Sequence, residues 1–297
     1  MRQLKGIFIP IITPFENGHF APSRLTQNLE SWNQSAAAGY VVFGSTGEAP
    51  LLQETEKLEI LRVARQAVGE GKLLIAGTGL ESTEATVVFT MRVAELGADA
   101  ALVLSPSFYQ ASLSPEAIRR HYVAIAEASP IPVLIYNVPK FTHLNLPLEV
   151  IAELSHHPKI AGVKDSAGNL TQLLELRERS NADFQILIGS DAIFFAGLAH
   201  HFNGAVLAIA NLVPRECVAL LHAVEAGEWD DARALAHRLF LIGRILSRYG
   251  VPGLKAALDE LGYWGGIPRP PLLPVDDASR EQIRNTLAQA NLLSVPA

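Results

Sequence analysis

The sequence predicts a (β/α)8 TIM barrel with additional helices after it. Eight short and almost continuously apolar runs recur along the 297 residues, with amphipathic stretches between them. Such runs are typical of parallel strands covered on both faces, and a spacing of about 20 to 35 residues suits strand and helix units. A doubly wound open sheet usually has about five or six strands, so the number of runs favours the barrel.

The individual elements follow from apolar periodicity. The expected strands are 6–12, 40–43, 73–76, 101–104, 132–136, 160–164, 184–188 and 205–208. The helices expected between them include 22–38, 55–68, 82–96, 114–128 and 147–154. Ser114 followed by Pro115 gives a clear helix start, because serine caps free amides and proline fits the first helical position.

Further helices are expected beyond the last strand, at 230–248, 253–262 and 278–290. A Gly-Val-Pro-Gly segment at 250–253 and a proline-rich segment at 267–274 separate them. No long polar linker or shift in composition marks a domain boundary. We therefore expect residues 1–225 to form the barrel and residues 226–297 to form a helical appendage packed on it.

Composition narrows the class of protein. Hydrophobic residues make up 49% of the chain and charged residues 18%, which predicts a sizeable core and argues against disorder. The net charge of -6 favours a small-molecule partner over nucleic acid or an anionic membrane. The single cysteine, Cys217, can form neither an intramolecular disulfide nor a thiolate metal site. The apolar run at 7–12 is too short for a secretion signal or a membrane span, so a cytoplasmic protein is expected.

Two of the candidate site segments follow predicted strands, where barrels of this type carry their active sites. Gly-Ser-Thr-Gly-Glu at 44–48 follows the second strand, and its backbone amides and two hydroxyls suit a small anion. A glycine-rich turn without such a role is an equally weighted alternative. Tyr136 ends the fifth strand, where the alternative to a catalytic phenol is a buried structural tyrosine.

Lys164 near the end of the sixth strand is the most informative residue. Side chains alternate along a strand, so Lys164 shares one face with Gly162 while Asp165 takes the other. An ammonium group is costly to bury, and burial therefore favours a neutral amine that can attack a carbonyl carbon. Gly162 is expected to leave space one pleat below the lysine. The alternative is a lysine that extends to the rim beside a carboxylate.

The remaining candidates are weaker. The histidine pairs at 156–157 and 200–201 are expected at the surface near helix ends, since adjacent residues on a helix do not converge on one ion. Lys255 falls within a predicted helix and is expected to be solvated. The sequence contains no HxH, HExxH or acidic cluster, so neither a metal ion nor another cofactor is expected.

Three motifs together resemble a known family. Gly-Ser-Thr-Gly-Glu at 44–48, Tyr-Asn-Val-Pro at 136–139 and Gly-Val-Lys-Asp-Ser-Ala-Gly-Asn at 162–169 are similar to its signatures, in the same order and at similar spacing. This family is the superfamily of dihydrodipicolinate synthase and N-acetylneuraminate lyase, which are pyruvate-dependent class I aldolases. The likeness covers nearly the whole chain. The stretches 44–52 and 252–266 look closest to 4-hydroxy-2-oxoglutarate aldolases.

The resemblance implies roles for individual residues. Lys164 would form the Schiff base with C2 of a 2-oxo acid such as pyruvate, and Tyr136 would transfer protons. Ser45 and Thr46 would hold the substrate carboxylate and link Tyr136 to Tyr109, a tyrosine that the family often supplies across a subunit interface. The resemblance also implies a homotetramer built as a dimer of dimers. Further implied pocket positions are Gly47, Ser166, Gly189 and the backbone of Val206.

Two positions depart from the family pattern. The lysine-biosynthesis enzymes carry an arginine two residues after the proline of the tyrosine motif, where it binds the carboxylate of aspartate semialdehyde; here the residue is Phe141. A phenyl ring forms no bidentate pair with a carboxylate. His143 stands where the family usually has glycine, and together with Lys140 it could supply positive charge.

We therefore expect a carbon–carbon lyase that cleaves or forms 4-hydroxy-2-oxoglutarate, or a similar 4-hydroxy-2-oxo acid, with pyruvate as the lysine-bound partner of an aldehyde. One alternative is 4-hydroxy-tetrahydrodipicolinate synthase, which condenses pyruvate with aspartate semialdehyde. Others are a sugar-acid aldolase or dehydratase acting through the same imine, and a 2-oxo acid binding protein without activity. The presence of Lys164, Tyr136 and Thr46 argues against a mere binding protein.

Overall fold

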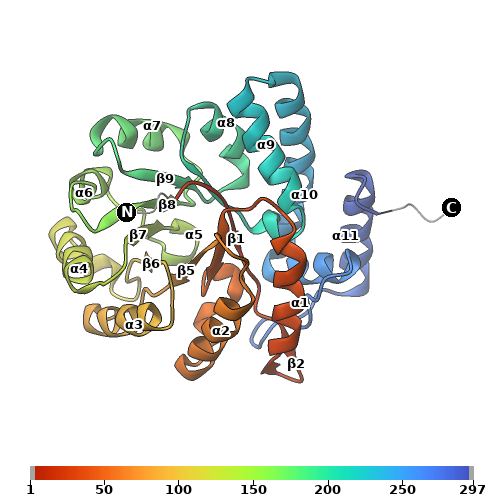
Figure 1. The fold of residues 1–297 in the computed structure, drawn as a ribbon, viewed down its shortest axis with the longest axis horizontal. Coiled ribbons are helices and arrows are strands. Elements are labelled where there is room, and N and C mark those ends of the chain that lie inside the picture. The colour runs from red at the N-terminus through yellow and green to blue at the C-terminus, as the bar shows by residue number, and fades with distance from the viewer. Residues whose placement is uncertain (1–3, 294–297) are drawn as a thin grey trace. The chain divides into compact units, whose positions relative to one another are not determined.

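The computed structural model describes residues 4–293, and its eight parallel strands close into a barrel (Figure 1). The order around the barrel is β1-β10-β9-β8-β7-β6-β5-β4. The strands are β1 (Gly6–Pro10), β4 (Gly39–Val42), β5 (Leu73–Gly77), β6 (Ala100–Leu104), β7 (Val133–Asn137), β8 (Ile160–Asp165), β9 (Gln185–Ile188) and β10 (Gly204–Val206). The predicted TIM barrel is confirmed, and each predicted strand overlaps an observed one.

A small hairpin after the first strand was not predicted. Strands β2 (Phe15–Glu16) and β3 (His19–Phe20) pair antiparallel around Asn17 and Gly18. Both turn residues have positive φ, 52° and 79°, which is the backbone that an Asn-Gly turn supplies. The Asn-Gly dipeptide was therefore the available signal, and strands of two residues are too short for an apolar pattern.

The predicted helices are present, with shifted ends. The helices are α1 (Pro22–Asn33), α2 (Glu54–Ala67), α3 (Thr83–Glu95), α4 (Pro115–Ala128), α5 (Pro139–Thr142), α6 (Leu148–Leu154), α7 (Leu170–Arg179), α8 (Phe194–Ala199), α9 (Pro214–Ala226), α10 (Trp229–Glu260) and α11 (Asp277–Gln289). Helix α1 ends five residues before the predicted end at 38. Its chain turns at Ser35, whose hydroxyl donates to the carbonyl of Trp32 at 2.6 Å.

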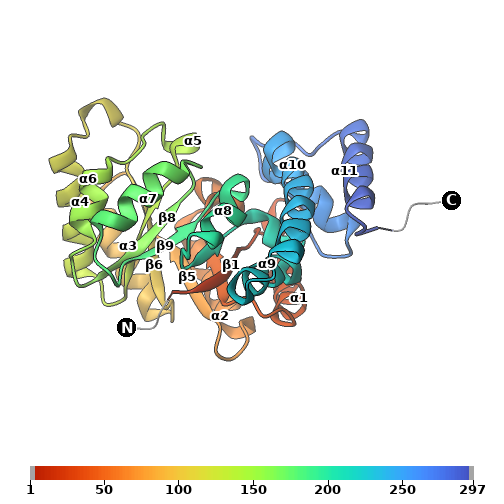
Figure 2. The same ribbon diagram turned by 90° about the horizontal axis from the view of Figure 1, so that it is seen from above.

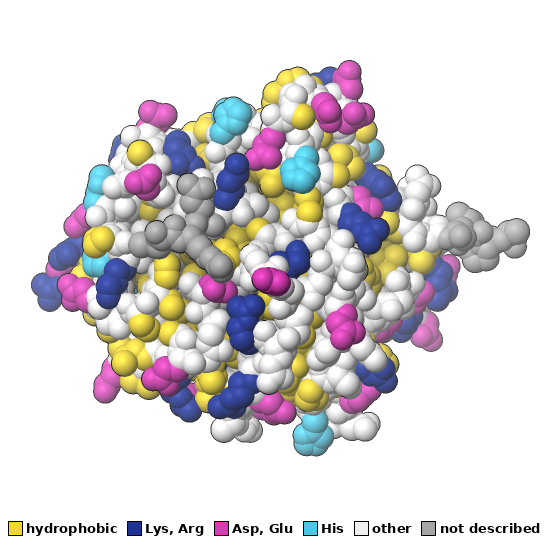
Figure 3. Space-filling view, viewed as in Figure 1, with side chains coloured by type: hydrophobic (Ala, Val, Ile, Leu, Met, Phe, Trp, Pro, Cys, Tyr) yellow, Lys and Arg dark blue, Asp and Glu magenta, His cyan; other side chains and the backbone are white. Residues whose placement is uncertain are grey.

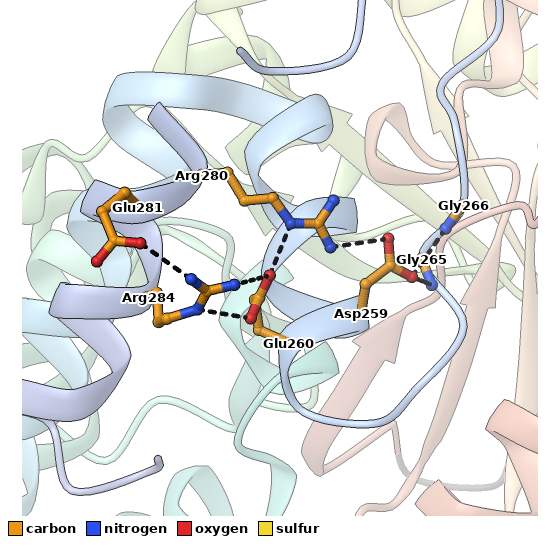
Figure 4. Close-up of polar contacts among 7 residues, drawn as sticks. All are labelled: Asp259, Glu260, Gly265, Gly266, Arg280, Glu281 and Arg284. Atoms are coloured by element: carbon orange, nitrogen blue, oxygen red, sulfur yellow. Dashed lines mark hydrogen bonds and ion pairs between the residues drawn. The ribbon is translucent and has the colours of Figure 1, made fainter. Parts of the chain in front are cut away.

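The described C-terminal helices form one bent helix and one separate helix. Helix α10 continues across the break predicted at 250–253, but Gly250 has non-helical angles of φ 61° and ψ -147°. Helix α10 packs against both α9 and α11 (Figure 2). Glu260 near its end accepts hydrogen bonds from Arg280 at 2.6 Å and Arg284 at 3.1 Å, which fasten α11 to α10 (Figure 4).

The chain divides into two compact units. Among the described residues, one unit contains 4–6 together with Leu73–Val206, and the other contains Ile7–Lys72 and 207–293. In the first unit, helices α3, α4, α6 and α7 follow successive strands and lie on one side of them (Figure 1). In the second unit, α1 packs on α2 and α9 packs on α10. The division at residue 225 that we expected from the sequence stays a prediction.

The surface carries mixed charge. In the view of Figure 3, basic and acidic side chains are interspersed. No helix within residues 4–293 is long and apolar enough to cross a membrane. The same residues contain no group of three or more His, Cys, Asp or Glu side chains placed to hold a metal ion. Of the two histidine pairs, His156, His200 and His201 are exposed and His157 is half-buried, as predicted for helix ends.

His121 on α4 is a buried titratable residue of the helical layer. Its Nδ1 lies 2.8 Å from the hydroxyl of Thr83 on α3, and its ring contacts Tyr122 edge-on. Its buried Nε2 has no hydrogen-bond partner among the described residues. Burial lowers the pKa of His121 from 6.5 to about 4, although the charge of Glu81 opposes this shift. The imidazole is therefore neutral in the folded protein at neutral pH.

Because burial lowers the pKa of His121, we expect the folded protein to lose stability in acid. The unfolded chain binds a proton at His121 below about pH 6.5, whereas the folded chain does so only near pH 4. We expect His121 to lower the free energy of unfolding by about 3 kcal/mol between pH 7 and pH 4. Urea denaturation at both pH values should show a smaller drop for His121→Leu than for the wild type. The exposed His156→Leu serves as the control, and an equal drop in all three proteins would contradict the prediction.

Candidate active site

Lys164 and Tyr136 lie side by side near the carboxyl ends of two neighbouring strands. They are register partners in the parallel pairing of β8 with β7. Lys164 is 4% exposed and Tyr136 is 6% exposed. The Nζ atom of Lys164 lies 4.1 Å from the centroid of the Tyr136 ring. The structure thus brings together the amine and the phenol that the sequence analysis singled out separately.

The neighbouring residues on the two strands show which face the lysine occupies. The side-chain amide of Asn137 donates to Asp165 at 2.6 Å and to Asn145 at 2.8 Å, and Asn145 donates to Gln172 on α7 at 3.0 Å. This network connects the strand ends to the helical layer. Because side chains alternate along a strand, Lys164 points away from the helices, into the barrel.

The inward orientation predicted for Lys164 is therefore confirmed. The alternative of a rim lysine paired with a carboxylate is wrong, because Lys164 is buried and no carboxylate of residues 4–293 forms an ion pair with it. A buried primary amine that no carboxylate holds is free to react with a carbonyl group.

Asp165 and Asn137 are site residues that the sequence analysis did not assign. Burial raises the pKa of Asp165, while its hydrogen bonds from Asn137 and from the backbone amide of Ala167 oppose that shift. The Ala167 amide lies 3.0 Å from the carboxylate, so Asp165 shapes the turn after β8. Their positions in the sequence could have indicated them, because Asn137 directly follows Tyr136 and Asp165 directly follows Lys164.

Gly162 has a different function from the one expected. We expected it to leave space below Lys164, but a Cβ atom there would overlap the carbonyl oxygen of Gln185 on β9. The glycine therefore permits close approach of two strands and leaves no room for substrate. Sequence periodicity alone does not show which neighbour occupies the space of a missing side chain.

Gly189, Ser166 and Val206 lie at the ends of adjacent strands. The amide of Gly189 donates to the carbonyl of Asp165 at 2.6 Å, and a Cβ atom on Gly189 would overlap the Ser166 hydroxyl. Val206 is buried at the end of β10, which pairs with β9. These three expected pocket positions thus belong to the same edge of the sheet as Lys164.

The residues after Tyr136 form the short helix α5. Phe141 is 54% exposed, and the Nζ atom of Lys140 lies 5.8 Å from its ring centroid. His143 ends α5 in the left-handed conformation, with φ 53°, and is exposed. The hydroxyl of buried Thr142 donates to the carbonyl of Val138 at 3.2 Å or of Leu144 at 3.0 Å. Phe141, Lys140 and His143 are therefore available to a second substrate or to solvent.

Tyr109 belongs to an exposed aromatic pair. It is 72% exposed and contacts Phe108 edge-on, with ring centroids 5.0 Å apart. The carboxylate of Glu81 accepts hydrogen bonds from the backbone amides of Ser107 and Phe108, at 3.0 and 2.9 Å, and so anchors this loop. An exposed aromatic pair on an anchored loop is typical of a binding surface.

The segment with Ser45 and Thr46 lies in the second unit. Both residues are half-buried in a single 3-10 turn, Ser45–Gly47. The carbonyl of Gly47 accepts a hydrogen bond from the hydroxyl of Thr13 at 2.7 Å. Glu48 then adopts the left-handed conformation with φ 57°. Ser45 and Thr46 are thus successive residues of one hydrogen-bonded turn.

Lys255 is buried, and the expectation of a solvated side chain is wrong. Its Nζ atom lies 2.5 Å from Glu48 Oε1, and neither side chain is exposed. Burial lowers the pKa of Lys255, and the charge of Glu48 opposes this shift. The helical pattern around Lys255 did not reveal this, because the partner is on a distant loop.

The barrel and the matches to known proteins together show a carbon–carbon lyase of the class I, pyruvate-dependent aldolase type. Residues 3–290 match the model of the dihydrodipicolinate synthetase family. The chain belongs to this family, whose members are pyruvate-dependent aldolases.

Similar proteins extend the comparison over the whole chain. A 4-hydroxy-tetrahydrodipicolinate synthase of Geotalea daltonii is 31% identical, over 98% of this chain and 100% of the relative. The same enzyme of Bartonella bacilliformis is 33% identical, over 98% of this chain and 99% of the relative. A solved dihydrodipicolinate synthase of Acinetobacter baumannii in complex with pyruvate has a TM-score of 0.93 and 28% identity, over 98% of this chain and 100% of that one.

These names confirm the superfamily predicted from the three motifs. They do not include a 4-hydroxy-2-oxoglutarate aldolase, so they support the synthase alternative better than the aldolase interpretation.

Proposed function

We propose that this protein joins Lys164 to C2 of pyruvate as an imine and makes or breaks a carbon–carbon bond at C3. The observation that carries the proposal is the inward, buried amine of Lys164 beside the phenol of Tyr136. The pyruvate complex described for the Acinetobacter baumannii synthase supports pyruvate as the bound 2-oxo acid.

The chemistry follows from the imine. The amine attacks the C2 carbonyl of a 4-hydroxy-2-oxo acid and water leaves, so that an iminium forms. Loss of the hydroxyl proton at C4 then breaks the C3–C4 bond, the aldehyde leaves, and the electron pair remains as an enamine. C3 takes up a proton, and water hydrolyses the iminium to release pyruvate and the free lysine. Condensation is the reverse sequence, and the iminium serves as the electron sink in both directions.

The other site residues have supporting roles in this proposal. Tyr136 transfers the protons of imine formation and bond cleavage. Its phenol ring lies next to the amine of Lys164, which makes its hydroxyl the candidate proton donor and acceptor. Ser45 and Thr46 bind the carboxylate of pyruvate and relay protons between Tyr136 and Tyr109. The pocket is completed by Gly47, Ser166, Gly189 and Val206.

The proposal includes a homotetramer in which Tyr109 reaches the site of a neighbouring subunit. The exposure of Tyr109 and Phe108, and the anchoring of their loop by Glu81, support this placement. A cytoplasmic location and the absence of nucleic-acid and membrane partners are further parts of the proposal.

The second substrate is the point on which two candidate functions differ. The relatives' names support aspartate semialdehyde and hence 4-hydroxy-tetrahydrodipicolinate synthase activity. Phe141 favours cleavage of 4-hydroxy-2-oxoglutarate to pyruvate and glyoxylate, because a phenyl ring replaces the arginine expected to bind the semialdehyde carboxylate.

One comparison of substrates tests the proposed function. Pyruvate release from a panel of 4-hydroxy-2-oxo acids would be measured with a coupled assay, alongside condensation of pyruvate with aspartate semialdehyde. We expect a higher kcat/KM for 4-hydroxy-2-oxoglutarate than for the semialdehyde. The reverse order would establish the synthase, and failure of every 2-oxo acid to react would overturn the lyase proposal.

Substitution of Phe141 should change this preference. We expect Phe141→Arg to raise kcat/KM for aspartate semialdehyde roughly tenfold or more, because a charge-assisted hydrogen bond to the carboxylate is worth about 1.5 to 3 kcal/mol. Phe141→Leu is the control, since it removes the ring without adding charge. An equal effect of both variants would show that the position does not bind the semialdehyde.

A further inference from the structure

A fully buried ion pair adjoins the Ser45 and Thr46 turn. Glu48 directly follows this turn, and its Oε1 lies 2.5 Å from Nζ of Lys255 on α10. The ammonium also donates to the carbonyl of Ile267 at 3.3 Å and lies over the ring of Phe15 at 4.5 Å from its centroid. The turn is thereby joined to helix α10 by a charge pair that is shielded from water.

Arg269 contacts the segment that contains Glu48 and Leu51 at two further points. Its backbone amide donates to Glu48 Oε2 at 2.8 Å, and its guanidinium donates to the carbonyl of Leu51 at 3.0 Å. The guanidinium also forms a bidentate pair with Glu56, with both hydrogen bonds at 2.7 Å. Arg269 therefore connects the loop to α2 through Glu56.

The segment that carries Arg269 is itself held against α10. Asp259 accepts hydrogen bonds from the backbone amides of Gly265 at 2.8 Å and Gly266 at 3.2 Å (Figure 4). A Cβ atom on Gly265 would overlap the carbonyl oxygen of Lys255, so this backbone packs directly on the helix. Lys255 and Arg269, which both contact Glu48, therefore belong to segments that pack against each other.

The contacts that hold Glu48 also constrain the Ser45–Gly47 turn that precedes it. Glu48 has a left-handed backbone, which is unfavourable for a residue with a side chain and persists only where its surroundings hold it. Its amide donates to the carbonyl of Ser45 at 3.2 Å, and a Cβ atom on the preceding Gly47 would lie 3.0 Å from the carbonyl oxygen of Ile11. Displacement of Glu48 would therefore displace Ser45 and Thr46.

A buried ion pair adds little net stability compared with a well-packed apolar pair, because both charges lose their hydration. Its distinctive contribution is a fixed geometry. We propose that Glu48, Lys255 and Arg269 are positioning residues that hold the Ser45 and Thr46 hydroxyls in the arrangement that binds the pyruvate carboxylate. Helix α10 would then contribute to substrate binding without touching substrate. This inference rests on the proposed function, from which it takes the role of Ser45 and Thr46.

The test separates geometry from stability. Lys255→Met and Glu48→Gln each leave one partner of the buried pair without its countercharge, whereas the double variant removes both charges. We expect thermal unfolding to show destabilised single variants and a double variant that regains most of the loss. Borohydride labelling of Lys164 at increasing pyruvate concentration would report substrate binding in each protein.

We expect the pyruvate concentration for half-maximal labelling to rise at least about tenfold in the double variant, while saturating pyruvate still labels Lys164 fully. Lys72→Met is the matched control: Lys72 also lies in the second unit and donates to the carbonyls of Ser35 and Ala37, at 2.8 and 2.7 Å. It should lower the unfolding temperature and leave the half-maximal concentration unchanged. Arg269→Gln provides a second test if the double variant does not fold, with a rise of the same kind.

Two failures are distinguishable. Wild-type half-saturation in a folded double variant, or in Arg269→Gln when the double variant does not fold, would overturn the positioning role alone. An unlabelled wild-type protein would instead overturn the proposed function on which the inference rests.

Discussion

Borohydride added together with pyruvate is expected to attach one reduced pyruvyl group to the protein, at Lys164. The amine displaces water from C2 to form an iminium, and hydride transfer to that carbon gives a stable secondary amine. Intact mass spectrometry would detect the addition, and peptide mapping would locate it. The inward, buried position of Lys164 next to Tyr136 is the reason for expecting this site.

The same residue carries the largest expected effect on turnover. Lys164→Ala should lose activity by about a thousandfold or more, since no other group supplies the covalent step. Lys164→Arg is the informative companion, because it keeps a long side chain that ends in nitrogen but does not form an imine. A modified peptide containing Lys255 in place of Lys164, or substantial activity in Lys164→Arg, would disprove the assignment.

Tyr136→Phe should reduce turnover by about a hundredfold or more, the usual scale for a group that transfers protons in the transition state. The variant keeps the ring that lies 4.1 Å from the lysine Nζ, so the packing of the site is preserved. Steady-state assays would measure kcat, and the rate of borohydride labelling should fall as well, because loss of water from the first adduct also needs a proton.

Tyr122→Phe is the matched control for the loss of a phenol. Tyr122 is fully buried, and its hydroxyl donates to the carbonyl of Val103 at 3.2 Å. Its substitution should lower stability and leave turnover close to that of the wild type. If Tyr136→Phe also turned over at the wild-type rate, another group would have to transfer the protons.

Local sequence patterns were enough to predict most elements of the barrel and to select Lys164 and Tyr136 as the candidate reacting residues. A near-continuous apolar run is a local pattern that is typical of a strand covered on both faces, and eight such runs were enough to predict the barrel. Alternation along one strand predicted that Lys164 lies on the inner face. The motif that contains Tyr136 identified the residue that lies beside this lysine. The resemblance of three motifs led to the superfamily that the family match confirmed.

Tertiary structure alone decided the surroundings of these residues. Lys255 has the same local pattern as a solvated helical lysine, but the fold places it against Glu48, and Arg269 meets that glutamate from 221 positions away. Gly162 likewise faces the backbone of another strand and not a vacant space. Periodicity records which face of an element is apolar, whereas the partner of a buried charge or of a missing side chain depends on which distant segments the folded chain brings together.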